Sequence, residues 1–133
     1  MGPKSDGGYV VCKEHSQQLS NVVSLGVENN IDFEIDFDQK FKPRRILLYD
    51  HTIQELPKKT KFLFTPKGIS TKKSKNFLTL ADMTRNFEDN KNLLKMDIEY
   101  DEWKVFEKAN VADLKKFSQI VCEFHFFFLI YMM

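Results

Sequence analysis

The sequence has 133 residues, of which 42% are hydrophobic and 29% charged, with a formal net charge of +1. The length suits one domain with a hydrophobic core, and the near balance of charges gives no overall attraction to nucleic acid or anionic membranes. The N-terminal MGPKSDGGYV lacks the apolar stretch of a signal peptide. We therefore expect a single domain over 1–133, cytoplasmic by default, with no membrane span and no nucleic-acid partner.

Short apolar runs recur along the chain with polar residues on either side, which is typical of strands covered on both faces. The first run, at 8–12, is predicted as a short strand or an ordered N-terminal segment. Five further runs predict buried strands at 21–25, 45–49, 61–65, 92–96 and 118–124.

Helices are predicted between these strands, at 76–88, 99–109 and 111–117. Residues 30–41 are ambiguous, because Ile31, Phe33, Ile35 and Phe37 alternate with acids as in a strand. Phenylalanines spaced four apart also permit a helix. The alternation of elements elsewhere favours the helix, since parallel strands require a crossover connection.

Two cysteines, Cys12 and Cys122, lie in apolar runs without the CxxC spacing of a metal or redox site. They are predicted as small buried hydrophobic residues.

Seven lysines and no acid fall within 57–76. They are compatible with a phosphate-binding patch, but a solvated loop with an edge strand protected by lysine is the preferred interpretation.

Alternating strands and helices predict an open α/β sheet, in which ligands bind at the carboxyl ends of the strands. Gly26 follows the first buried strand and would let the backbone approach a ligand closely; an ordinary turn glycine is the alternative. Asp50 ends the second strand, where a carboxylate can accept the hydroxyls of a ribose. Its alternative role is to cap a helix starting at Thr52.

Asp97 and Glu99 flank the end of the strand at 92–96. Carboxylates there can face a ligand's amino group, bind a metal or accept a proton, or else cap the next helix or form an acidic turn. His51 adjoins Asp50, and His125 ends the strand at 118–124. Either histidine could reach the pocket, although a single histidine is more often structural.

Five segments together resemble the FkbM-type methyltransferase family, closest to its eukaryotic methyltransferase-like branch. They are DGGYVVC (6–12), SLGVENNIDFE (24–34), YDHT (49–52), LLKMDIEYDEW (93–103) and IVCEFH (120–125). The most specific piece is KMDIEYDEW, similar to the family pattern K-[IM]-D-[IV]-E-G-x-E-W. The resemblance covers about residues 4 to 125.

The resemblance implies a Rossmann-like, three-layer fold with a mainly parallel sheet, S-adenosylmethionine (SAM) as cofactor, and O-methyl transfer to a small-molecule or sugar hydroxyl. It implies a helix over 31–41, Gly26 near the methionine part of SAM, and Asp50 near the ribose. The cofactor-binding residues are then expected to be Ser24, Gly26, Val27, Glu28, Asp50, His51, Ser70 and Asp97, with Asp97, Glu99 and His125 as catalytic candidates and no metal ligand.

Three departures from the family pattern stand out. Tyr100 replaces the usual glycine after D-x-E, and the glycine-rich loop keeps only Gly26. The chain also ends soon after the strand at 118–124, where family members continue, with an atypical apolar tail at 126–133. We therefore expect a truncated domain that lacks the last strands.

Two other functions remain open. A truncated domain could be a non-catalytic SAM-binding remnant or an interaction module, which the short C-terminus and Tyr100 favour. A dinucleotide-dependent oxidoreductase would have a similar fold, but the sequence lacks its GxGxxG motif. A competition test would distinguish the two cofactors, because NADH should not displace SAM from a methyltransferase.

Overall fold

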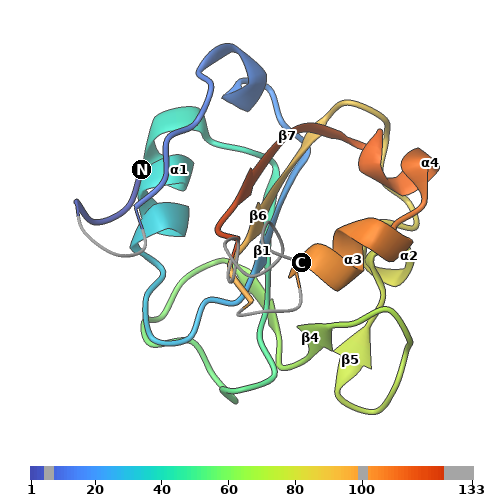
Figure 1. Ribbon diagram of the computed structural model, residues 1–133. Helices are drawn as coiled ribbons and strands as arrows, with labels where there is room; N and C mark the ends of the chain where they lie inside the picture. Colours follow the sequence, from blue (N-terminus) through green and yellow to red (C-terminus); the bar gives the residue numbers. More distant parts are fainter. Residues whose placement is uncertain (5–7, 99–101, 125–133) are drawn as a thin grey trace, which may run out of the picture.

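A five-stranded sheet forms the centre of the molecule, as a computed structural model that describes residues 1–4, 8–98 and 102–124 shows (Figure 1). All neighbouring strands in it are parallel. Their spatial order is β3 (Leu63–Thr65), β2 (Arg45–Tyr49), β1 (Asn21–Leu25), β6 (Asn92–Met96) and β7 (Phe117–Cys122). Strands β2 and β3 lie on one side of β1, and β6 and β7 lie on the other, so the strand order reverses between β1 and β6.

Helices cover both faces of this sheet, and a small two-stranded parallel ribbon lies beside it (Figure 1). The helices are η1 (Glu14–Ser16), α1 (Asp32–Phe41), α2 (Leu80–Met83), α3 (Glu102–Lys108) and α4 (Val111–Leu114), and the ribbon consists of β4 (Gly68–Ile69) and β5 (Phe77–Leu78). Helix α1 lies on one face, with α2, α3 and α4 on the other. The chain is thus an α/β protein with a Rossmann-like, three-layer arrangement.

Side chains of the central strands alternate between two hydrophobic cores. Val22 points toward the core under α1, where it joins Phe33 and Phe37. The next residue, Val23, points to the other core, which includes Val105 of α3. Successive strand residues face opposite sides of a sheet, so NVVSL is buried along its whole length because both faces are covered.

The five strands and the helix at α1 confirm the predicted alternation, although β3 begins two residues later than expected and is not buried, since Leu63 is 51% exposed. The alternating phenylalanines of 30–41 are helical because Phe33 and Phe37 share one buried face. The acids Asp32 and Glu34 also lie in the first turn, where the helix dipole favours negative charge.

The prediction of a helix at 76–88 was wrong over most of that range. Phe77 and Leu78 instead pair with Gly68 and Ile69, a non-local pairing that helical periodicity does not reveal. Thr79 then starts the short α2 through a capping box, in which its side chain accepts from the Asp82 amide and the Asp82 carboxylate accepts from the Thr79 amide. Residues 8–12 form an ordered segment and no strand.

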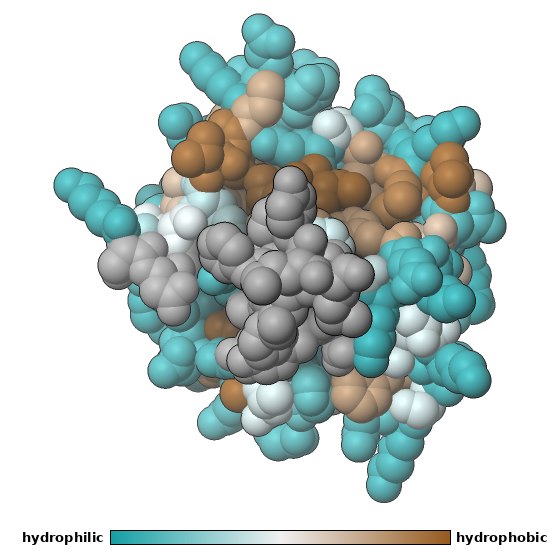
Figure 2. Space-filling view, viewed as in Figure 1, coloured by the Kyte–Doolittle hydropathy of each residue, from teal (hydrophilic) through white to brown (hydrophobic). Residues whose placement is uncertain are grey.

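The surface seen in Figure 2 shows a band of hydrophobic side chains in the region where Figure 1 places β7. Ile120 of β7 is 38% exposed, and Val10 of the N-terminal segment is 94% exposed. Among the described residues β7 pairs with β6 alone, at the edge of the sheet. None of the described helices is long and apolar enough to cross a membrane.

The two thiols differ in their surroundings, and the predicted burial of Cys12 was wrong. Cys12 is exposed because residues 8–12 lie outside the sheet, whereas Cys122 is partly buried at the end of β7. Burial raises the pKa of the Cys122 thiol to about 12, assisted by the negative charges of Glu102, Asp97 and Glu123.

We expect a thiol reagent at pH 8 to modify Cys12 quickly in the folded protein and to leave Cys122 unmodified, because the thiolate is the reactive form. Both thiols should react after denaturation. Mass spectrometry of the labelled protein counts the modified sites, and Cys12→Ser should abolish fast labelling. Fast labelling of two thiols in the native state would contradict the buried position of Cys122.

Candidate functional site

A pocket lies where β1, β2 and β6 end, at the point where the strand order reverses. The Gly26 amide donates to the Tyr49 carbonyl over 3.0 Å, and the Asp97 amide donates to the Leu25 carbonyl over 3.0 Å. These bonds hold the three strand ends together. The pocket has a volume of ≈ 290 Å³, close to the lower end of the range for small-molecule clefts. Its lining residues are Leu25, Gly26, Glu28, Tyr49, Asp50, His51, Thr52, Gly68, Ile69, Phe77, Asp97 and Ile98.

Gly26 is required at the floor of this pocket for two reasons. Its φ is +79°, a conformation that residues with a side chain rarely adopt. A Cβ atom there would lie 1.9 Å from the Asp97 carbonyl oxygen. The glycine therefore lets the turn after β1 pass directly over the end of β6, which the interpretation as an ordinary turn glycine does not explain.

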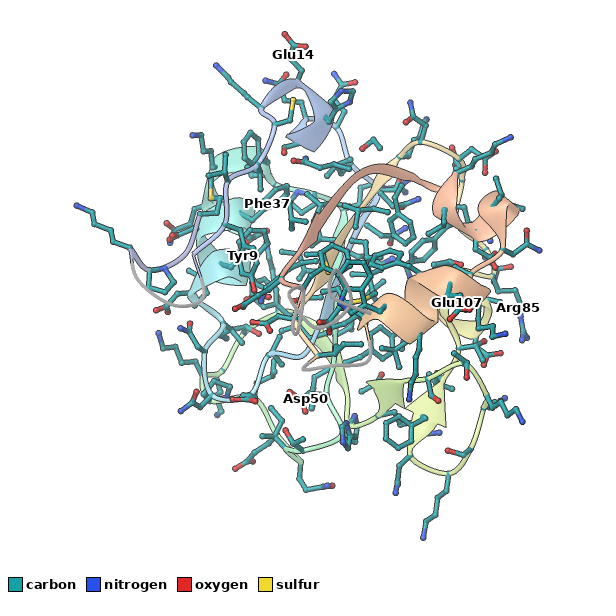
Figure 3. The ribbon with its side chains drawn as sticks, in the orientation of Figure 1. Tyr9, Glu14, Phe37, Asp50, Arg85 and Glu107 are labelled. Atoms are coloured by element: carbon teal, nitrogen blue, oxygen red, sulfur yellow. The ribbon has the colours of Figure 1, made fainter. Side chains whose placement is uncertain are left out.

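Asp50 fixes the conformation of the loop that follows Gly26 (Figure 3). Its Oδ2 accepts hydrogen bonds from the amides of Val27 and Glu28, at 3.0 and 2.7 Å. Its Oδ1 accepts from the amide and hydroxyl of Thr52, at 2.7 and 2.6 Å. No helix begins at Thr52, so the alternative role of Asp50 as a helix cap was wrong.

These contacts also set the acidity of Asp50. Burial alone would raise the pKa of its carboxyl, but the hydrogen bonds from Thr52, Glu28 and Val27 outweigh burial and lower that pKa below the ordinary value of 3.8. A carboxyl whose pKa is lower in the folded chain stabilises the fold above its unfolded pKa. That stabilisation is lost as the pH falls through the folded value.

We expect Asp50→Asn to lower the free energy of unfolding by about 1–2 kcal/mol at pH 7, because an amide cannot accept all four hydrogen bonds. The difference from wild type should shrink as the pH falls below about 4. Urea denaturation over a pH series measures it. Asp89→Asn, at an exposed aspartate, is the matched control and should have little effect; an equal effect of both variants would refute the role of Asp50.

The opposite wall of the pocket comes from the small ribbon. The rings of His51 and Phe77 lie 4.7 Å apart, centroid to centroid. A Cβ on Gly68 would come within 2.7 Å of His51 Nδ1 and 2.9 Å of the Phe77 ring. The absence of a side chain at Gly68 therefore leaves room for two flat rings at the side of the pocket.

Five of the predicted site residues line the pocket, and these are Gly26, Glu28, Asp50, His51 and Asp97. Three others do not: Ser24 and Val27 are buried behind it, and Ser70 lines a separate cavity beside α2 and α3. Glu99 and His125 lie outside the described residues. Among the residues described, no group of three His, Cys, Asp or Glu side chains is arranged to hold a metal ion.

The sequence reasoning missed the contribution of the ribbon, namely Gly68, Ile69 and Phe77. Gly68 follows Pro66-Lys67 in a lysine-rich stretch that suggested a loop, and no local pattern reveals its pairing with β5. Two lysines of that stretch contact acids of α1, since Lys58 Nζ lies 3.1 Å from Asp32 and Lys61 Nζ 3.1 Å from Asp38. The two lysine side chains are 59% and 75% exposed, which agrees with the interpretation of a solvated loop.

A buried polar cluster lies behind the pocket. Lys95 of β6 and Glu34 of α1 form an ion pair with an N–O distance of 3.0 Å, and their side chains are 5% and 0% exposed. Ser24 of β1 donates its hydroxyl hydrogen to the same Glu34 oxygen, Oε1. The pair thus ties α1 to the two strands between which the sheet order reverses.

One comparison with known proteins identifies a family for the chain. No curated protein and no solved structure matches the chain. The family model described as the methyltransferase FkbM domain matches residues 3–130, nearly the whole chain. The match includes every strand of the central sheet and every lining residue of the pocket, and the chain therefore belongs to the FkbM methyltransferase family.

Proposed function

We propose that the protein is a SAM-dependent methyltransferase that transfers a methyl group to the oxygen of a small-molecule or sugar hydroxyl. The family supports methyl transfer. The observation that carries the proposal is the convergence of Gly26, Asp50 and Asp97 on one pocket at the reversal point of the sheet. Ligands of open α/β sheets bind at this position.

The pocket lining suits the parts of SAM. The amino-acid part is proposed to lie against the Gly26 turn, where Asp97 can accept a hydrogen bond from the ammonium group. The ribose is proposed to lie beside Asp50, and the adenine against the rings of His51 and Phe77. Aromatic faces stack well on nucleobases. The negative charges of Glu28, Asp50 and Asp97, which line the pocket, complement the positively charged sulfonium and ammonium groups of SAM.

SAM would supply an electrophilic methyl group on a sulfonium. The new O–CH₃ bond would form as the S–CH₃ bond breaks, with the electron pair left on sulfur and the hydroxyl proton passed to a base of the protein. The protein's main task is then to align acceptor and methyl group. Asp97 lies against the Gly26 turn, on the proposed cofactor side, so Glu99 and His125 are our preferred bases among the three candidates.

The proposal is tested by incubating the full chain with SAM and a panel of hydroxylated small molecules and sugars, and measuring S-adenosylhomocysteine by mass spectrometry. We expect acceptor-dependent product formation, and a large loss of turnover in Glu99→Gln or His125→Asn with unchanged cofactor affinity. Cofactor binding without turnover on any acceptor would favour the non-catalytic alternative. Displacement of SAM by NADH would favour a dinucleotide-dependent enzyme.

A further inference from the structure

The described N-terminal residues, 1–4 and 8–12, contact α1 at one end and β7, at the edge of the sheet, at the other. The Cys12 amide donates to Gln119 Oε1 of β7 over 2.6 Å, which fixes one end of the segment. The Gly2 amide donates to Asp36 Oδ2 of α1 over 2.9 Å at the other end. Tyr9 lies between these anchors, on the side of α1 that faces the sheet (Figure 3).

The Tyr9 ring covers the buried ion pair of Lys95 and Glu34. Its centroid lies 5.4 Å from Lys95 Nζ, and the Phe33 centroid lies at the same distance of 5.4 Å from that atom. The two rings meet edge to face, 5.6 Å apart. A buried cation beneath two aromatic rings is a favourable arrangement, and it leaves the Tyr9 ring little freedom to move.

From this position the phenol of Tyr9 contacts a residue that lines the pocket. It donates a hydrogen bond of 2.9 Å to Asp97 Oδ2, although the two residues are 88 positions apart in the sequence. The backbone of Asp97 is held separately by its amide bond to the Leu25 carbonyl. The hydroxyl therefore restricts the side chain of Asp97, whose main-chain position is already set by the sheet.

We propose that Tyr9 is a positioning residue, which holds the Asp97 carboxylate in the orientation that receives the ammonium group of the cofactor's amino-acid part. The inference rests on the proposed function. A binding side chain that is held by a second group loses less conformational freedom when the ligand arrives. The N-terminal segment thereby contributes to cofactor affinity without touching the ligand.

Two probes separate positioning from general damage to the pocket. S-adenosylhomocysteine carries the amino-acid part, and 5′-methylthioadenosine has the same nucleoside and thioether without it. We expect Tyr9→Phe, which keeps the ring over Lys95, to weaken S-adenosylhomocysteine binding roughly five- to tenfold in calorimetric titrations. Affinity for 5′-methylthioadenosine should stay the same, because that probe does not need Asp97.

A double-mutant cycle provides the second readout. Asp97→Ala should weaken S-adenosylhomocysteine binding on its own, and adding Tyr9→Phe to Asp97→Ala should cause no further loss. Equal losses for both probes, no loss for either, or additive losses in the cycle would overturn the role of Tyr9. Failure of the wild-type chain to bind either probe would overturn the proposed function and this inference with it.

Discussion

Gly26→Ala should be among the most damaging single changes in the protein, with an expected loss of roughly 3–5 kcal/mol in the free energy of unfolding. The left-handed backbone conformation is itself costly for alanine. The new methyl group would also overlap the Asp97 carbonyl, 1.9 Å away, and relief requires the ends of β1 and β6 to separate. Urea denaturation followed by circular dichroism measures the loss.

Gly68→Ala is the matched control, because its new methyl group would meet the movable side chains of His51 and Phe77. We expect a smaller loss of stability than in Gly26→Ala, together with weaker cofactor binding as the rings shift into the pocket. A Gly26→Ala variant that is as stable as wild type would show that the turn after β1 does not pass over β6 as described.

Lys95→Met should destabilise the fold by about 3–5 kcal/mol, because it leaves the Glu34 carboxylate buried without its cation. Glu34 Oε2 already has no hydrogen-bond partner among the described residues, so the remaining support would come from Ser24 alone. Thermal and urea denaturation of the variant against wild type give the size of the effect.

The double variant Glu34→Leu/Lys95→Met should recover most of that stability. Two apolar side chains of similar volume remove both buried charges, and such replacements are often neutral or stabilising. A double variant that is less stable than Lys95→Met would contradict this account. It would show that the unpaired Glu34 carboxylate is not what destabilises the single variant.

The central sheet could be predicted from the sequence because its strands are local apolar runs. NVVSL and NLLKM are buried on both faces, and each is followed directly by a residue of the pocket, Gly26 or Asp97. The rule that ligands bind at the carboxyl ends of parallel strands then located the pocket from those ends. The helix within 30–41 could be predicted because parallel strands need a crossover connection, although the local alternation of apolar and acidic residues suggested a strand.

What the sequence did not reveal depends on contacts between distant residues. The pairing of Gly68–Ile69 with Phe77–Leu78 creates one wall of the pocket, and two-residue strands have no periodicity to detect. The hydrogen bond from Tyr9 to Asp97 joins segments 88 positions apart. Ser24 was expected to contact the cofactor, yet its hydroxyl faces Glu34 inside the fold.

The most direct test of the proposed cofactor site is hydrogen exchange of the folded chain with and without S-adenosylhomocysteine. We expect slower exchange in peptides that cover 25–28, 49–52 and 68–69. Peptides that cover 44–45 and 86–88, around a cavity at the amino ends of the strands, should not change. No protection by a saturating ligand concentration, or protection at the amino ends instead, would contradict the assignment of this pocket to the cofactor.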